Sequence, residues 1–281
     1  MKIIENKVLE GERAMFASSE IDIRGCVFQN GESPLKESYD LKITGSRFSW
    51  KYPLWYCKNV EVTDTRLDES ARSGIWYTRG ITMTDCEIIA PKTFRRASGV
   101  TLVRCNMPNA LESMWSCKDI SLKDVNITGD YFGMNSENVE CDGLTVNGNY
   151  IFDGAKNIVV RNSRLISKDS FWNCENVTVY DSYFDGEYIG WNSKNVTFVN
   201  CKIRSNQGFC YMDNLVLKNC VLFETDLAFE YSSVNAEVRS HIDSVKNPIS
   251  GVIEAESIGE IILEEDKVDL TKTSIKVSVK K

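Results

Sequence analysis

Metal ligands and long apolar segments are scarce in this sequence. It contains one histidine, His241, and no two cysteines separated by two residues, whereas structural zinc sites use four such ligands with paired spacing. No stretch of about 18 apolar residues occurs that could span a membrane, and the first residues do not resemble a signal peptide. We therefore expect no metal, no other cofactor, no membrane partner and no secretion.

Positive charge is also in short supply, because 33 lysines and arginines face 40 aspartates and glutamates and the net charge is −7. Binding to nucleic acid needs a concentrated cationic surface, so we expect no nucleic-acid partner. At 281 residues, 42% of them hydrophobic, the chain has enough apolar material for one large core or two smaller ones.

What the sequence does contain is a repeat of about 19 residues. The first apolar residue of an alternating apolar and polar motif marks each repeat: Ile21, Leu41, Val60, Ile81, Val100, Ile120, Val139, Ile158, Val177, Val196 and Leu215. Period-two alternation predicts a short strand with one inward face, and such a strand buries that face only by stacking on its neighbours. The repeat therefore predicts an all-β, single-stranded right-handed parallel β-helix of roughly 11–12 coils, since crossovers between parallel strands are right-handed.

One domain is expected over residues 1–281. Residues 1–20 would form an N-terminal cap and the opening coil, residues 21–232 the regular coils, and residues 233–281 irregular final coils with a C-terminal cap strand. The segment "TSIKVSV" near the end alternates like such a closing strand, and strand edges need a cover because they promote aggregation.

Two columns of small or polar residues agree with stacked coils. Asparagine precedes the marker at Asn59, Asn138, Asn157, Asn176, Asn195 and Asn214. Asparagine tolerates the left-handed backbone of a corner, so this column predicts an asparagine ladder from Asn138 to Asn214.

Eight of the ten cysteines occupy positions shared with other small or apolar residues: Cys26, Cys57, Cys86, Cys105, Cys117, Cys174, Cys201 and Cys220. They are interpreted as core residues with free thiols in a reducing cytoplasm, although Cys86/Cys105 and Cys201/Cys220 lie on adjacent rungs, within reach of disulfide geometry.

Tryptophan concentrates in one column, five residues before the marker, at Trp55, Trp76, Trp115, Trp172 and Trp191. Lys36, Arg95 and Asp153 share this column, and charged residues are rarely buried without a partner, so the column is expected to face solvent. Two interpretations remain open. In the first, an aromatic stripe binds the rings of a sugar chain. Its residues are Trp55, Trp76, Arg95, Arg96, Trp115, Asn135, Asp153, Trp172, Asn173, Trp191 and Asn192. In the second, the rings stack on one another and only stiffen the coil.

Candidates for catalysis are fewer. Carboxylates near the stripe are Glu112, Asp130, Asp153, Asp169 and Glu187, and Arg95 could hold an anionic group. A glycosidase needs two carboxylates about 5–10 Å apart, which neighbouring rungs could supply. The sequence nevertheless favours a solvated loop or turn residue as the interpretation of each of these acids. Whether a reaction is catalysed stays open.

Several segments resemble a known family, among them "WKYPLWY", "GDYFGMNSEN", "SFWNCENVTVYDS" and "EYIGWNSKN". Over residues 5–270 the chain is similar to the bacterial domain-of-unknown-function family 3737, within the pectin-lyase-like right-handed β-helix superfamily. The resemblance implies the fold and no activity. Pectate lyases and polygalacturonases belong to this superfamily, but their catalytic Asp, His and Arg motifs have no counterpart here.

We therefore expect a cytoplasmic β-helix whose stripe binds an oligosaccharide or a similar ligand. The alternative is a non-catalytic structural or protein-interaction scaffold. In either case the stripe or the C-terminal cap could join copies into a homo-oligomer.

Overall fold

The computed structural model, which describes residues 1–278, confirms the predicted fold class. The chain is an all-β parallel β-solenoid of about 15 turns with about 19 residues per coil. It divides into two compact units, Met1–Thr145 and Val146–Lys281. The prediction of a single domain stays a prediction. Among the described residues, no helix is long and apolar enough to cross a membrane.

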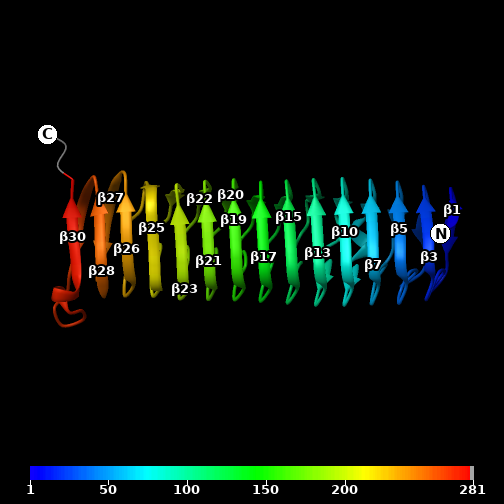
Figure 1. Cartoon of the computed structure of the whole chain (residues 1–281), viewed down its shortest axis with the longest axis horizontal. Helices are drawn as coiled ribbons and strands as arrows, with labels where there is room; N and C mark the ends of the chain where they lie inside the picture. Colours follow the sequence, from blue (N-terminus) through cyan, green and yellow to red (C-terminus); the bar gives the residue numbers. More distant parts are fainter. Residues whose placement is uncertain (279–281) are drawn as a thin grey trace. The chain divides into compact units, whose positions relative to one another are not determined.

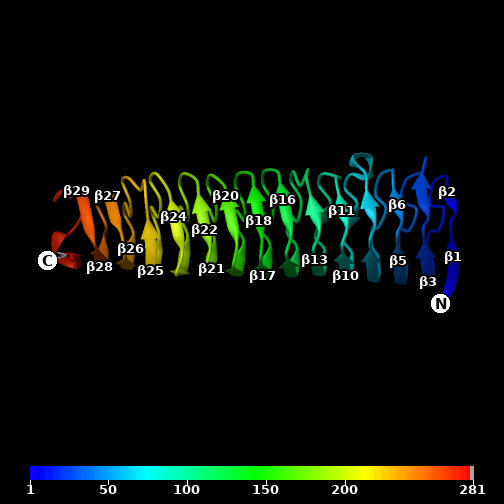
Figure 2. The same ribbon diagram turned by 90° about the horizontal axis from the view of Figure 1, so that it is seen from above.

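The first unit contains three columns of parallel strands (Figures 1 and 2). The main column consists of β1 (Lys2–Glu5), β3 (Ser19–Arg24), β5 (Tyr39–Thr44), β7 (Lys58–Thr63), β10 (Arg79–Thr84), β13 (Ser98–Val103), β15 (Lys118–Lys123) and β17 (Glu137–Asp142). The second consists of β2 (Val8–Glu10), β4 (Val27–Gln29), β6 (Arg47–Phe48), β8 (Arg66–Leu67), β11 (Glu87–Ile88), β14 (Asn106–Met107) and β16 (Asn126–Thr128). A third is the pair β9 (Ile75–Trp76) and β12 (Phe94–Arg95), and η1 (Glu69–Ala71) is a short 3-10 helix.

The second unit continues the same pattern. Its main column consists of β19 (Lys156–Arg161), β21 (Glu175–Tyr180), β23 (Lys194–Val199), β25 (Asp213–Leu222), β26 (Ser233–Val238), β28 (Ser250–Ala255) and β30 (Thr273–Val277). The shorter strands are β18 (Thr145–Asn147), β20 (Arg164–Ile166), β22 (Tyr183–Asp185) and β24 (Lys202–Arg204). β27 (His241–Lys246) and β29 (Ser257–Ile262) form a separate parallel pair, and η2 (Leu270–Lys272) is a 3-10 turn.

The repeat markers form an inward row, as predicted. In the first unit Val60, Ile81 and Val100 are register partners on adjacent parallel strands. In the second unit the row runs from Ile158 through Val177 and Val196 to Leu215. All of these side chains are buried. Because each coil buries its apolar face only against its neighbours, the spacing of the markers sets the register of the strands.

The end coils show why the expected number of 11–12 coils was too low. Lys2 is the register partner of Ile21, Gly251 of Val234, and Thr273 of Gly251. These positions carry no apolar marker, so a count of markers misses their coils. The predicted closing strand is confirmed as β30, which pairs in parallel with β28.

The asparagine column forms the predicted ladder in the second unit. The side-chain amide of each residue donates to the oxygen of the one before it, with all three N–O distances at 3.0 Å. The ladder runs through Asn157, Asn176, Asn195 and Asn214, whose φ angles lie between 54° and 61°. In the first unit Asn138 donates to Asp119 (2.8 Å). The column thus combines a left-handed corner with a hydrogen bond between coils.

All ten cysteines are buried and free, as predicted. Burial raises the pKa of the Cys57 thiol to about 12, and it also raises the pKa values of Cys141 and Cys174. Since the thiolate is the reactive form, these thiols are inert in the folded protein. Cys86 and Cys105 lie close enough for a hydrogen bond between their thiols, and so do Cys201 and Cys220.

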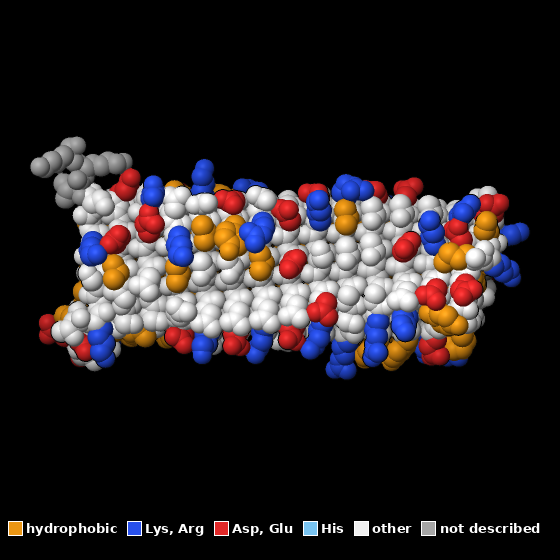
Figure 3. Space-filling view, viewed as in Figure 1, with side chains coloured by type: hydrophobic (Ala, Val, Ile, Leu, Met, Phe, Trp, Pro, Cys, Tyr) orange, Lys and Arg blue, Asp and Glu red, His pale blue; other side chains and the backbone are white. Residues whose placement is uncertain are grey.

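Charged side chains of both signs lie close together on the face seen in Figure 3. Ion pairs join oppositely charged residues of adjacent coils, such as Lys118–Glu137 (2.7 Å) in the first unit and Lys156–Glu175 (3.0 Å) in the second. Exposed pairs of this kind contribute little to stability individually.

Candidate functional site

The predicted aromatic stripe is a stack of rings in the first unit. The Trp55 and Trp76 rings lie 5.1 Å apart and 7° from parallel. The Arg95 guanidinium follows on the next coil, 4.7 Å from the Trp76 centroid and 4.6 Å from that of Trp115. The side chains stack because β9 and β12 pair in register, with Trp76 opposite Arg95.

A second row of rings lies beside this stack. The Tyr56 and Tyr77 rings are 4.8 Å apart and 6° from parallel. The Arg96 guanidinium lies 5.9 Å from the Tyr77 centroid, and the Lys36 ammonium 5.6 Å from that of Tyr56. A cation thus lies at each end of this pair of rings and stabilises its exposed aromatic surface through cation–π contacts.

The polar edges of the stripe indoles are already engaged. Trp55 Nε1 donates to the Ser73 carbonyl (2.5 Å), Trp76 Nε1 to that of Lys92 (2.8 Å), and Trp115 Nε1 to that of Tyr131 (2.6 Å). Ring contacts cover part of the indole faces too, since Tyr52 packs 4.5 Å from Trp55 and the Arg95 guanidinium lies 4.6 Å from Trp115. All five stripe indoles are half-buried.

In the second unit the stripe continues with polar partners. The Asn192 amide donates to Asn173 (2.7 Å), and the Asn173 amide lies 3.4 Å from an Asp153 carboxylate oxygen. Trp172 stacks on Tyr150 at 6.2 Å, and Trp191 meets Tyr188 edge-on at 5.3 Å. Asn135, in the first unit, is an exposed corner residue with a φ of 55°.

The candidate catalytic residues divide into two groups. Glu112 forms ion pairs with Lys92 (3.0 Å) and Arg95 (3.7 Å), so its charge compensates the stripe cations. The backbone carbonyl of Asp130 accepts a hydrogen bond from the Glu112 amide (3.0 Å).

Asp153, Asp169 and Glu187 come together in the second unit. Burial raises the pKa of Asp153, against a hydrogen bond from Asn173 that lowers it. Burial also raises the pKa of Asp169, which is 3% exposed, and the charges of Glu187 and Asp153 act in the same direction. Glu187 itself pairs with Lys168 at 3.6 Å. Raised carboxyl pKa values occur at catalytic sites and also at purely structural ones.

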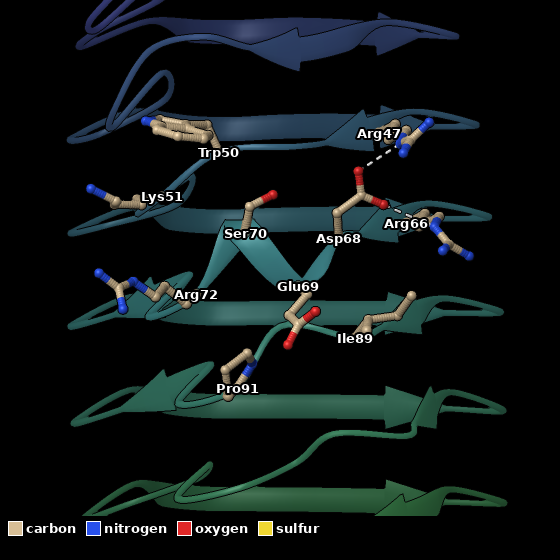
Figure 4. Close-up of a pocket in the computed structure, with 10 residues that line it drawn as sticks. All are labelled: Arg47, Trp50, Lys51, Arg66, Asp68, Glu69, Ser70, Arg72, Ile89 and Pro91. Atoms are coloured by element: carbon tan, nitrogen blue, oxygen red, sulfur yellow. Dashed lines mark hydrogen bonds and ion pairs between the residues drawn. The ribbon is translucent and has the colours of Figure 1, made fainter.

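A pocket of about 720 Å³ in the first unit was missed by sequence reasoning (Figure 4). Its lining residues are Arg47, Trp50, Lys51, Arg66, Asp68, Glu69, Ser70, Arg72, Ile89 and Pro91. The pocket lies where the repeat is longest, because 21 residues separate Val60 from Ile81 instead of 19. The additional residues form η1, whose turn projects beyond its neighbours in Figure 2. The longer spacing, together with a sixth tryptophan outside the stripe column, was the available signal.

Asp68 organises one edge of the pocket. Its carboxylate accepts hydrogen bonds from Arg47 Nε (2.7 Å), Arg66 Nε (2.9 Å) and Ser49 Oγ (2.7 Å). Burial alone would raise the pKa of Asp68, but these hydrogen bonds outweigh burial and hold the pKa below its ordinary value. Arg66 also pairs with Glu87. Both arginines on this edge are therefore neutralised.

The rest of the pocket carries an exposed indole, a paired lysine and, among the described residues, two charged side chains without a partner. The Trp50 side chain is 39% exposed, and within residues 1–278 its ring contacts no other ring and no arginine. Its neighbour Lys51 lies 5.5 Å from the ring centroid and pairs with Glu32 at 3.0 Å. In the same described part of the chain, no hydrogen bond or ion pair reaches the side chains of Arg72 and Glu69, which are exposed. No cluster of described residues could hold a metal ion.

The fold and these two surface sites define a parallel β-helix repeat protein with ring-bearing surfaces and no metal-ligand cluster among its described residues. The chain belongs to the family described as "Protein of unknown function (DUF3737)", whose model matches residues 2–276. No curated protein matches it.

Three solved structures are similar to this chain at a low level. PfbA, a surface adhesin of Streptococcus pneumoniae, is 11% identical over 92% of this chain and 70% of its own, with a TM-score of 0.37. The periplasmic alginate epimerase AlgG is 9% identical over 98% and 74%, with a TM-score of 0.32. HetL, a pentapeptide repeat protein from the cyanobacterium Nostoc, is 10% identical over 78% and 92%, with a TM-score of 0.26. These values carry no argument about function.

Proposed function

We propose that the protein binds carbohydrate, and that its binding site is the pocket at η1. The observation that carries this proposal is Trp50, an exposed indole without a ring or arginine partner, beside the unpaired side chains of Arg72 and Glu69. The five stripe tryptophans differ in this respect, since each is packed against a ring or an arginine.

The residues of the pocket suit a sugar. One face of a pyranose presents C–H groups and is flat, so it packs against an indole face, while its hydroxyls need hydrogen-bond partners. Glu69 can accept hydrogen bonds from two neighbouring hydroxyls, and the Arg72 guanidinium can donate to ring or substituent oxygens. A volume of about 720 Å³ also falls within the range of ordinary ligand pockets.

In this proposal the aromatic stripe mainly stabilises the coil. Most of its ring faces already contact neighbouring rings or Arg95, and three of its indole N–H groups bond backbone carbonyls. The prediction of a sugar-binding stripe is tested at Trp115, a half-buried indole of the first unit's stripe.

Glycan-array screening followed by titration of the best ligand tests the proposal. Trp50→Ala should weaken binding by about 1–3 kcal/mol, as removal of a central aromatic contact does, and should leave the melting temperature nearly unchanged. Trp115→Ala is the matched control and should keep the affinity. If Trp115→Ala loses binding and Trp50→Ala does not, the site lies on the stripe.

An interaction scaffold is the second candidate. It is supported by exposed apolar side chains in the final coils, namely Ile249, Ile261, Leu263, Leu270 and Val277. Such residues would join two copies through the C-terminal cap, where apolar surface tends to mark an interface. A mass measurement in solution that gives a dimer, reversed to a monomer by Ile261→Lys, would support this function, and an array without any glycan ligand would exclude the first.

The proposal also places the protein in the cytoplasm. Ten buried free thiols support a reducing compartment, because disulfides form and persist in the oxidising compartments of secreted proteins.

A further inference from the structure

We infer that the pocket at η1 selects sugars that carry an oxyanion, a carboxylate or a phosphate, and that Arg72 binds this group. The inference rests on the proposed function, because it names the ligand class of the same pocket. It is carried by the charges of the lining residues and by their arrangement.

Basic residues outnumber acidic ones in the lining of the pocket, although Glu32 and Glu87, just outside the lining, pair with two of them. Four of its lining residues are basic and two are acidic, while the whole chain has a net charge of −7. Three of the four cations have partners, since Arg47 and Arg66 pair with Asp68 and Lys51 pairs with Glu32. Among the residues that the structure describes, the charges of Arg72 and Glu69 are left without a partner. In Figure 4 Glu69 lies between the two edges of the pocket and Arg72 lies on the edge of Trp50, so the inference rests on the position of Arg72 and not on a net positive charge.

The arrangement of the side chains separates two edges. In Figure 4 the side chains of Trp50, Lys51 and Arg72 lie along one edge, and those of Arg47 and Arg66 lie along the other. Trp50 and Lys51 are neighbours on one coil, and Arg72 belongs to the next. A sugar ring packed against Trp50 would therefore direct a substituent toward Lys51 and Arg72. A guanidinium can bind carboxylate or phosphate oxygens in a bidentate manner, which an isolated ammonium cannot.

Backbone and side-chain bonds hold this part of the pocket in place. The Arg72 carbonyl accepts a hydrogen bond from the Tyr52 amide (3.4 Å), and Ser70 Oγ donates to the Ser49 carbonyl (2.7 Å). The η1 turn is thus tied to the preceding coil at two points. These bonds fix the backbone from which the Arg72 side chain projects. A site whose backbone is already ordered loses less entropy when its ligand binds, which favours recognition of an anion by Arg72.

The experiment measures dissociation constants by NMR chemical-shift titration, which detects millimolar binding. The ligands are glucose, glucuronate, glucose 6-phosphate and inorganic phosphate, each at low and at physiological salt. The wild-type protein should bind at least one of the two anionic sugars about tenfold more tightly than glucose, a difference that salt reduces. The tighter of the two identifies the group as carboxylate or phosphate.

The variants separate recognition of charge from recognition of the ring. Arg72→Gln should abolish the preference for anionic sugars and keep the affinity for glucose, while Arg72→Lys should restore part of the preference. Arg79→Gln, at an exposed arginine of β10, is the matched control and should change nothing. Trp50→Ala should weaken all of the sugars.

The outcomes are distinct. Equal affinity of the wild-type protein for glucose and both anionic sugars overturns the inference and leaves the proposed function intact. Inorganic phosphate that binds as tightly as glucose 6-phosphate also overturns it, because the ring would then contribute nothing. No binding of any sugar overturns the proposed function itself.

Discussion

At the scale of single residues, Asn195 adopts a left-handed backbone conformation at a corner and also forms hydrogen bonds to both neighbouring coils. Its φ is 54°, a conformation that costs an ordinary L-residue roughly 1–2 kcal/mol. Its side chain donates to Asn176 and accepts from Asn214, both at 3.0 Å. Glycine removes the backbone cost but cannot form the ladder, so two substitutions at this position separate the two contributions.

We predict that Asn195→Ala lowers the free energy of unfolding by about 2–3 kcal/mol, and Asn195→Gly by only about 1 kcal/mol. Denaturant titration of both variants measures the difference. Equal losses would mean that the left-handed corner contributes nothing and that only the amide ladder matters.

Asp169 gives a residue-scale prediction about pH. Burial raises its pKa above the ordinary value of 3.8, so the folded chain binds the proton more tightly than the unfolded chain does. The raised pKa therefore costs stability progressively as pH rises from the ordinary value to the folded one, and the cost is then constant. Asp169→Asn removes this cost, and asparagine keeps the left-handed φ of 55°.

We expect Asp169→Asn to be more stable than the wild-type protein at pH 7 and to lose that advantage as pH falls toward 3.8. Unfolding curves at several pH values measure the difference. Asp181→Asn is the matched control, because Asp181 has a similar φ of 49° on an exposed corner. An advantage that does not change with pH would contradict the assignment to the Asp169 carboxyl.

At the scale of elements, the stripe links consecutive coils through stacked rings and the Arg95 guanidinium. The loss of one ring therefore removes contacts between coils. Trp115 illustrates this, because it covers the Arg95 guanidinium and donates to the Tyr131 carbonyl (2.6 Å).

We predict that Trp115→Ala lowers the free energy of unfolding by about 2–3 kcal/mol, somewhat less than for a fully buried tryptophan. Thermal and denaturant unfolding measure this loss, and Trp50→Ala should cost less than about 1 kcal/mol by comparison. If the two variants are equally stable, the stripe does not stiffen the coil.

At the scale of the whole molecule, the cysteines report on the compartment. All ten are buried and free, and the parallel stacking leaves Cys86 beside Cys105 and Cys201 beside Cys220. These two pairs are the sites at which oxidation could close a disulfide, since residues at equivalent positions of adjacent coils meet the distance requirement.

Titration of the denatured, unreduced protein should therefore find eight or more free thiols among the ten. The native protein should react far more slowly, because burial raises the pKa of thiols such as Cys57 and excludes the reagent. Two or fewer free thiols would indicate an oxidising compartment and contradict the proposed location.

The sequence by itself determined the parallel β-helix, its register and its inward columns. A strand that buries one face needs an identical neighbour, so the 19-residue spacing of residues such as Val177 and Val196 already specifies which positions are partners. The corner asparagines and core cysteines follow from the same spacing. The end coils were not predicted because Lys2, Gly251 and Thr273, which are not apolar markers, occupy the marker positions there.

Only the tertiary structure decided which rings are free. The sequence places Trp55, Trp76 and Arg95 in one column, but whether their faces meet solvent or one another depends on side-chain directions across coils. The pocket at η1 likewise depends on a local insertion whose 3-10 turn brings Arg72 and Glu69 to the same surface as Trp50. Repetition specifies what every coil shares, whereas a binding site arises where one coil differs, and the shape of that difference is set by packing in three dimensions.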